Sequence, residues 1–247
     1  MMAEIALEVH NVKLSYHSRQ SYSIKNSLLQ FRKSECKEIP ALRGVTFDVA
    51  KGEVLGVVGR NGSGKSTLLQ TLAGVFNPDA GTIDRKNNSI SLLSLGSGFQ
   101  IELTGRENIM LNGLLLGFSR AQMTKKMDEI IDFSELREFI DMPVRTYSSG
   151  MNSKLAFSIT AIMETDIILI DEVLAVGDAG FRNKSYNKMR QLIDDRNRTA
   201  IVVSHQENNL RELCSRVMWI DDGLVREIGE TNQVMDHYLE SLKKKRI

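Results

Sequence analysis

The feature of this sequence that most constrains its fold is a glycine-rich run, Gly59-Arg60-Asn61-Gly62-Ser63-Gly64-Lys65-Ser66-Thr67. It matches the pattern G-x-x-x-x-G-K-[ST], whose glycines let successive backbone N–H groups converge on phosphate oxygens. An apolar strand at 53–58 leads into the run and a helical pattern begins at Lys65, so the positive end of that helix points at the same place. We predict that the run binds a nucleotide, with Lys65 reaching the β- and γ-phosphates and Ser66 holding Mg²⁺.

A second motif lies about a hundred residues further on, where the apolar strand 167–171 ends in Asp171-Glu172. An acid at the carboxyl end of a parallel strand lies at the edge of the sheet where ligands bind. Asp171 is suited to hold Mg²⁺, usually through a water molecule. Glu172 is suited to polarise the water that attacks the γ-phosphate. Together with the phosphate loop, this pair predicts nucleotide hydrolysis, with Lys65 and Glu172 as catalytic residues.

The hydrophobic pattern predicts an α/β protein. The strands at 53–58, 167–171 and 200–204 are continuously apolar, which is typical of a parallel sheet with helices on both faces. The strands before the first long helix, at 5–9 and 44–49, look antiparallel. Residues 76–165 are mainly helical and separate two strands of the sheet. We therefore expect a phosphate-loop NTPase core with a mostly parallel sheet, an antiparallel β subdomain and an inserted α-helical subdomain at about 96–165.

The composition limits the partners and the cellular location that can be expected for this chain. The 247 residues carry a net charge of +1, which gives no electrostatic reason to expect a nucleic-acid partner. The two cysteines match no metal or redox spacing, as expected for a reduced, cytoplasmic protein. No apolar run is long enough to span a bilayer, and the N-terminus lacks the pattern of a signal peptide. If the chain acts at a membrane, we expect it to dock on a protein already there.

Two segments belong neither to the predicted α/β core nor to the nucleotide motifs. Residues 18–38 interrupt the early strands, and within them Ile24, Leu28 and Phe31 share one face of a helix that Ser23 could cap. That helix either packs on the surface of the domain or faces a membrane partner. The basic residues of the predicted tail 241–247, beyond the domain 1–240, either remain solvated or contact anionic lipid.

Between the two nucleotide motifs lies Tyr147-Ser148-Ser149-Gly150-Met151, which resembles the signature motif of ABC ATPases, usually written LSGGQ. Tyr, Ser149 and Met151 depart from that consensus, whereas Ser148 and Gly150 keep its core. A serine hydroxyl and free N–H groups at a helix start can bind an anion. The resemblance implies that Ser148, Ser149 and Gly150 contact ATP held by a second copy of the chain, in a head-to-tail dimer.

Other positions follow the order of the same family. Asp178 matches its D-loop at the dimer interface, His205 its switch histidine at the γ-phosphate, and Tyr16 the aromatic residue that stacks on adenine. The family's Q-loop glutamine, which contacts Mg²⁺ and the transmembrane partner, has only Gln100 as a candidate. Gln100 lies several residues later than usual, and Ser94 or Leu95 would occupy the expected place.

A narrower resemblance rests on the insertion before Pro40, the runs 95–99 and 102–108, the divergent signature motif and the run 171–178. This set is similar to ATPase subunits that export bacterial O-antigen, capsular or teichoic-acid polysaccharides. It implies a membrane permease as partner, which we expect to contact the helical surface near 96–117. It also implies a lipid-linked glycan as cargo and a peripheral location on the cytoplasmic side of the inner membrane. Some members carry an added C-terminal carbohydrate-binding domain, and the chain leaves no room for one, so it is either naturally absent or was removed.

Alternatives remain open. The chain could serve a different ABC exporter or importer, or it could be a soluble ABC ATPase. The latter usually joins two cassettes or inserts a long coiled coil, and this chain has one cassette and no sustained heptads. A regulatory sensor that does not hydrolyse ATP is disfavoured because Glu172 and His205 are both present.

Overall fold

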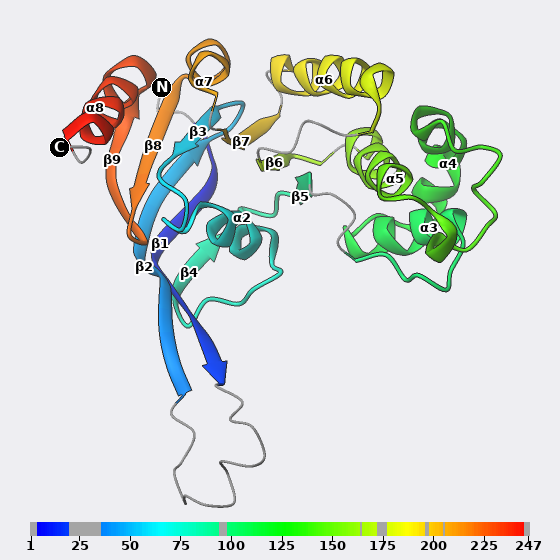
Figure 1. Cartoon of the computed structure of the whole chain (residues 1–247), viewed down its shortest axis with the longest axis horizontal. Helices are drawn as coiled ribbons and strands as arrows, with labels where there is room; N and C mark the ends of the chain where they lie inside the picture. Colours follow the sequence, from blue (N-terminus) through cyan, green and yellow to red (C-terminus); the bar gives the residue numbers. More distant parts are fainter. Residues whose placement is uncertain are drawn as a thin grey trace, which may run out of the picture.

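The structure, a computed structural model, describes residues 4–19, 36–93, 98–163, 165–171, 177–195, 198–204 and 206–244, without the side chains of residues 18, 19, 36, 37 and 244. Figure 1 shows two sheets at one end of the molecule and a group of helices at the other. In the part of the chain described, no helix has both the length and the apolar character needed to cross a membrane.

The larger sheet has the strand order β5-β6-β7-β3-β8-β9. All neighbouring pairs in it are parallel except β8 and β9. Its central strands are buried, as their continuous apolar sequences predicted. Its members are β3 (Val54–Val58), β5 (Ile90–Leu93), β6 (Ile167–Asp171), β7 (Thr199–Val203), β8 (Arg216–Asp221) and β9 (Leu224–Glu230).

The smaller sheet is antiparallel and has the order β2-β1-β4. It consists of β1 (Ile5–Arg19), β2 (Cys36–Ala50) and β4 (Ala80–Asp84). The antiparallel start of the chain is therefore confirmed. The first two strands are much longer than predicted, because they pair with each other from Ile5 opposite Ala50 as far as Arg19 opposite Cys36.

The helices are short to medium in length, and several carry caps that the sequence encodes. Thr104 and Glu107 form a capping box at the start of α3, and Ser119 and Gln122 form one at the start of α4. The helical elements are α2 (Lys65–Ala73), α3 (Gly105–Leu115), α4 (Arg120–Ser134), the 3₁₀ turn η1 (Val144–Thr146), α5 (Ser149–Ile162), α6 (Ala179–Asp194), α7 (Glu207–Leu213) and α8 (Thr231–Lys244).

Helices α3, α4 and α5 pack on one another and have an apolar cluster of their own, which includes Ile109, Met123 and Leu155. They lie at the end of the molecule opposite β8 and β9 (Figure 1). Phe133 contacts both this cluster and the core under the larger sheet, so the two parts are continuous. These helices fall within the predicted subdomain at about 96–165, whose boundaries stay a prediction.

The fold class predicted from the sequence is confirmed: a mostly parallel sheet, an antiparallel sheet and an added group of helices. The predicted helix that contains Ile24, Leu28 and Phe31 lies outside the described residues, as does most of the insertion 18–38. Helix α8 continues to Lys244, so the first residues of the predicted tail 241–247 belong to that helix. The reason is local: the run after 231 contains no helix breaker before the chain ends.

Candidate functional site

Three neighbouring strands of the larger sheet bring the predicted nucleotide motifs together. The phosphate loop follows β3, Asp171 ends β6, and β7 lies between those two strands and ends at Val203. All three run parallel, so their carboxyl ends meet at one edge of the sheet. A hollow of about 430 Å³ opens there. Its lining comprises Tyr16, Ile39, Pro40, Ala41, Asn61, Gly62, Gly64, Lys65, Ser66, Thr67, Asp171 and Val203.

The phosphate loop has the backbone geometry that its glycines allow. Gly64 precedes α2 with φ 104°, and a Cβ atom there would lie 2.6 Å from the carbonyl oxygen of Ala41. Any other residue would be strained at this φ and would also collide with that backbone. The close approach of the loop to Ala41 therefore requires glycine at position 64.

Lys65 lies inside the loop rather than in solvent, with only 7% of the residue exposed. Its Nζ donates hydrogen bonds to the carbonyl oxygens of Gly59, at 2.7 Å, and Arg60, at 3.0 Å. The hydroxyl of Ser63, also buried in the loop, has no hydrogen-bond partner. A buried cation and an unpartnered hydroxyl in one loop are suited to an anionic ligand.

Tyr16 stands at the side of this hollow on β1. Its hydroxyl lies 3.1 Å from the Oγ1 of Thr67, and its ring packs edge-to-face on Phe76 with the centroids 5.7 Å apart. The residue remains 39% exposed, so part of the ring is free to contact a ligand. The structure thus places Tyr16 beside the phosphate loop, where a base-stacking aromatic residue was expected.

The remaining predicted residues of the hydrolytic site are only partly described. Ser66 and Asp171 line the same hollow and offer a hydroxyl and a carboxylate oxygen. Glu172 and His205 lie outside the described residues, directly after Asp171 and Ser204. Their catalytic roles stay predictions.

The predicted signature residues lie on a different surface. Ser148 caps α5, and its Oγ accepts a hydrogen bond from the N–H of Met151 at 3.2 Å. Ser148, Ser149 and Gly150 line a second hollow of about 600 Å³, together with Asp178 at the start of α6. This hollow shares no lining residue with the first one.

Asp178 is held by two donors. Its Oδ2 lies 2.7 Å from the Nζ of Lys154, and its Oδ1 accepts from the N–H of Phe181 at 3.0 Å. The hydrogen bond from Lys154, followed by that from Phe181, lowers the pKa of Asp178 to about 2. The sequence identified Asp178 but not Lys154, because no local motif marks a lysine whose partners are distant in the chain.

Gln100, the candidate Q-loop residue, is not among the residues that line the hollow of Ser66 and Asp171. The side chain of Asn108 holds the backbone of Gln100. The N–H of Gln100 donates to the Oδ1 of Asn108, and the Nδ2 of Asn108 donates to the carbonyl oxygen of Gln100. Its side chain is exposed. The role of Gln100 as a metal ligand stays a prediction that these contacts do not support.

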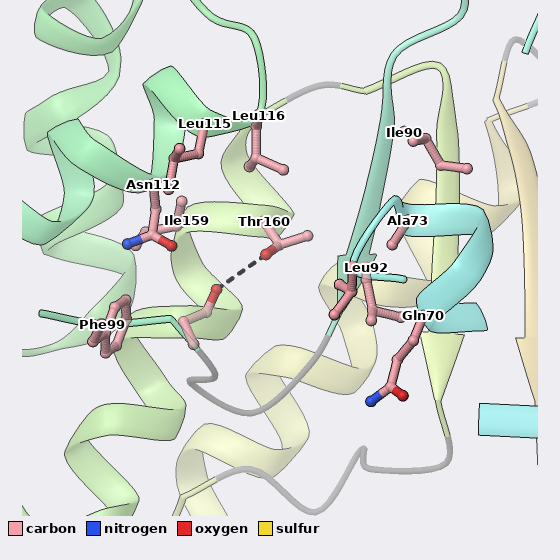
Figure 2. A pocket seen from close by; sticks show the side chains of 12 residues that line it. Gln70, Ala73, Ile90, Leu92, Phe99, Asn112, Leu115, Leu116, Ile159 and Thr160 are labelled. Carbon is pink, nitrogen blue, oxygen red and sulfur yellow. Dashed lines mark hydrogen bonds between the residues drawn. The ribbon is translucent and has the colours of Figure 1, made fainter. Parts of the chain in front are cut away.

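A third hollow, of about 340 Å³, forms a groove between the helices α3 and α5 on one side and α2 and β5 on the other (Figure 2). Its lining is mostly apolar, and Gln70 and Asn112 supply amides on the two sides. Leu115 is 73% exposed there. The sequence pointed to 96–117 as a contact surface but missed the share of α2 and β5, which reach the groove only through the fold. The lining residues are Gln70, Ala73, Val75, Ile90, Leu92, Phe99, Asn112, Leu115, Leu116, Ala156, Ile159 and Thr160.

Solved structures share this arrangement. The chain superposes with a TM-score of 0.71 on an ATP-binding subunit of an ABC transporter, at 19% identity over 97% of this chain and 98% of the other. It superposes with a TM-score of 0.67 on a dimeric ATP-binding cassette bound to ADP and Pi, at 21% identity over 91% and 98% of the two chains. At these identities the likeness shows a shared fold.

Relatives of known name are much closer in sequence. The chain is 46% identical to the O-antigen export system ATP-binding protein RfbB of Klebsiella pneumoniae, over 82% of both chains. It is 46% identical to the RfbB of Myxococcus xanthus and 39% identical to the teichoic acids export ATP-binding protein TagH of Bacillus anthracis, over 83% and 95% of this chain. It spans less than half the length of these two, 46% and 44%.

A family model described as "ABC transporter" matches residues 42–175, which run from the middle of β2 through the phosphate loop and the signature residues to just beyond Asp171. This match covers more than half of the chain, and the relative from Klebsiella pneumoniae is similar over most of its length. The chain therefore belongs to the ABC transporter family, in which it is an ATP-binding, ATP-hydrolysing subunit.

Proposed function

We propose that this chain powers the export of a lipid-linked polysaccharide of the O-antigen, capsular or teichoic-acid type across the bacterial cytoplasmic membrane. The observation that carries the proposal is the joint lining of one hollow by Tyr16, the phosphate loop and Asp171, in a chain whose named relatives are ATP-binding proteins of O-antigen and teichoic-acid export. ATP hydrolysis at this site would supply the energy for export, and the named relatives indicate the class of cargo.

Within one copy, the loop N–H groups and Lys65 would bind the phosphates of ATP, and Tyr16 would contact the base. Ser66 and Asp171 would hold Mg²⁺, because a hydroxyl and a carboxylate oxygen are ligands this ion prefers, and the bound ion neutralises charge on the phosphates. Glu172 would orient the attacking water, and His205 would contact the γ-phosphate.

A second copy of the chain completes the site. The hollow of Ser148, Ser149, Gly150 and Asp178 shares no residue with the phosphate-loop hollow of the same copy. In a head-to-tail dimer, each signature cap would face the ATP held by the other copy. The γ-phosphate is then contacted from both sides only in the closed dimer. ATP binding therefore favours the closed dimer, and hydrolysis allows the dimer to open.

The third hollow suits the permease. It is a mostly apolar groove, and the exposed apolar residues Val75 and Leu115 line it. A segment of a membrane-embedded partner docked there would place this chain on the cytoplasmic face of the membrane. The groove contacts α2, which begins at the phosphate loop, so opening and closing of the dimer would move its walls.

The substitution Glu172→Gln tests the hydrolytic assignment. The variant should bind ATP as the unchanged chain does, while its turnover falls by about a hundredfold or more, because the amide cannot polarise the attacking water. Steady-state phosphate release and nucleotide titration measure the two effects. Glu129→Gln, at an exposed position on α4, is the control and should retain full turnover. Unchanged turnover in Glu172→Gln would refute the role of Glu172.

Export is tested in cells that lack the chain. Complementation with the unchanged chain should restore the polysaccharide at the cell surface, whereas Glu172→Gln should leave lipid-linked glycan inside. Co-purification of the chain with a multispanning membrane protein is expected in the same strain. Normal surface polysaccharide in the deletion strain would contradict this cargo and favour a different ABC transporter.

A further inference from the structure

Lys154 connects three separate elements at the edge of the second hollow. It lies on α5, and 14% of its side chain is exposed. Its Nζ lies 2.7 Å from the Oδ2 of Asp178 and 3.2 Å from the Oε2 of Glu135. Glu135 ends α4 and Asp178 begins α6, so one ammonium group joins the ends of two helices to a third.

Glu135 is anchored independently of Lys154. It adopts a left-handed backbone conformation with φ 60° at the C-terminal end of α4, and its Oε1 lies 3.1 Å from the Nζ of Lys184 on α6. The same Nζ donates to the carbonyl oxygen of Phe133 at 2.9 Å. Glu135 therefore offers Lys154 a fixed partner, because its other oxygen already bonds a lysine that is itself held by the backbone.

The backbone before α6 lies directly over the stem of Lys154. Gly177 has φ 70°, and a Cβ atom there would lie 2.9 Å from the Cε of Lys154. The Nζ also lies 5.1 Å from the centroid of the Phe181 ring. The lysine stem thus packs against Gly177 and Phe181, and its charged end contacts Asp178.

We infer that Lys154 is a positioning residue for ATP hydrolysis, which fixes the signature cap Ser148–Gly150 and Asp178 in one arrangement so that both reach the partner copy's ATP together. Lys154 lies on the same helix that Ser148 caps, and Asp178 caps the next one, so the Lys154–Asp178 contact sets the distance between the two caps. This inference rests on the proposed function, because the two caps matter to hydrolysis only if a second copy presents ATP to them.

The alternative is that the contact serves stability alone. Asp178 is 65% exposed, and an ion pair with a solvent-exposed partner adds little to stability. A stability role predicts that loss of Lys154 lowers the melting temperature and leaves turnover per folded molecule unchanged. A positioning role predicts a loss of kcat, since small misplacements of groups at a reacting centre can cost about a hundredfold in rate.

The decisive variant is Lys154→Met, which keeps most of the apolar stem beside Phe181 and removes the charge. Nucleotide binding to the monomer, measured with a fluorescent ATP analogue, should change by less than about twofold, since Lys154 does not line the phosphate-loop hollow. The kcat for ATP hydrolysis should fall at least about tenfold. Lys154→Arg, which can still reach a carboxylate, should recover part of that loss.

The matched control is Lys184→Met. It removes the second lysine on Glu135 but leaves the contact between Lys154 and Asp178. Its kcat should stay within about twofold of the unchanged chain. If Lys154→Met does not fold, Asp178→Asn replaces it: asparagine also caps helices, so this variant removes the charge and keeps the cap. It should show the same fall in kcat without loss of nucleotide binding.

The Glu172→Gln background distinguishes a failure of the proposed function from a failure of the role of Lys154. ATP should drive dimer formation in Glu172→Gln, measured by sedimentation, and adding Lys154→Met should weaken dimerisation at least about tenfold. Failure of Glu172→Gln itself to dimerise with ATP would count against the proposed function. Dimerisation and kcat that are both unaffected by Lys154→Met, with the proposed function intact, would overturn the role of Lys154 alone.

Discussion

At the residue scale, the phosphate loop depends on Gly64 more than on Gly62. Both have positive φ, so alanine costs about 1–2 kcal/mol of backbone strain at either position. A Cβ atom at Gly62 has nothing within 4 Å, whereas one at Gly64 would collide with the carbonyl of Ala41. We expect Gly64→Ala to weaken ATP binding at least about tenfold more than Gly62→Ala does, as measured by nucleotide titration. Equal losses in the two variants would show that strain alone, and not the collision, sets the effect.

Asp178 allows a second test at this scale. Its pKa of about 2 lies below the ordinary value of 3.8, first because Lys154 donates to it and then because the N–H of Phe181 does. The stability that this carboxylate contributes is therefore present above pH of about 4 and is lost as the pH falls towards 2. In Lys154→Met we expect the pKa, followed by NMR of labelled aspartate, to rise towards 3.8. In Lys184→Met it should not move.

The sequence predicted those site residues whose geometry is local. The phosphate loop is encoded by consecutive residues, and Ser148 and Asp178 cap helices that begin directly after them. Lys154 could not be found in this way, because its carboxylate partners come from other helices. The spacing of residues in a motif predicts local backbone shape, whereas contacts between distant elements can be identified only once the fold is known.

At the element scale, two strands had no usable signal in the sequence. Strand β4 is almost wholly exposed, so it lacks the alternation of apolar and polar residues that marks a half-buried strand. Strand β9 is only partly buried and contains Gly229. Both form by pairing with a neighbour, β4 with β1 and β9 with β8. The buried strands β3, β6 and β7 were predictable because burial on both faces selects continuous apolar runs.

The packing of α8 on β9 should depend on pH. The Nδ1 of His237 lies 3.0 Å from Glu227, and this hydrogen bond, aided by the charges of Glu227, Glu240 and Asp236, raises the pKa of His237 above 6.5. Because the pKa is raised on folding, the added stability is present below pH of about 6.5 and is lost as the pH rises through the raised value. We expect Glu227→Gln to remove most of this dependence in urea unfolding between pH 6 and 8. Glu240→Gln, which removes only a more distant charge, should reduce it less.

At the scale of the whole molecule, the groove in Figure 2 is where we propose that the permease docks, and α2, which begins at the phosphate loop, forms part of its wall. Leu115→Glu places a charge at its most exposed apolar residue. The isolated chain should keep its ATPase activity within about twofold, since surface substitutions cost little stability, while export in complemented cells should be lost. Leu224→Glu, on β9 and outside the groove, is the control and should export normally. Export that survives Leu115→Glu would place the permease elsewhere.

The pairing of β1 has a consequence for nucleobase recognition. Strand β4 covers β1 only as far as Lys13, so beyond that residue β1 and β2 form a two-stranded ribbon. Isolated ribbons of this kind are marginally stable in water. Tyr16 stands on this ribbon, and its hydroxyl contacts Thr67 while its ring packs on Phe76, so these two contacts join the ribbon to the phosphate-loop side of the hollow. In the proposed site, the position of the ring that would meet the nucleobase therefore depends on how firmly these outer parts of β1 and β2 are held.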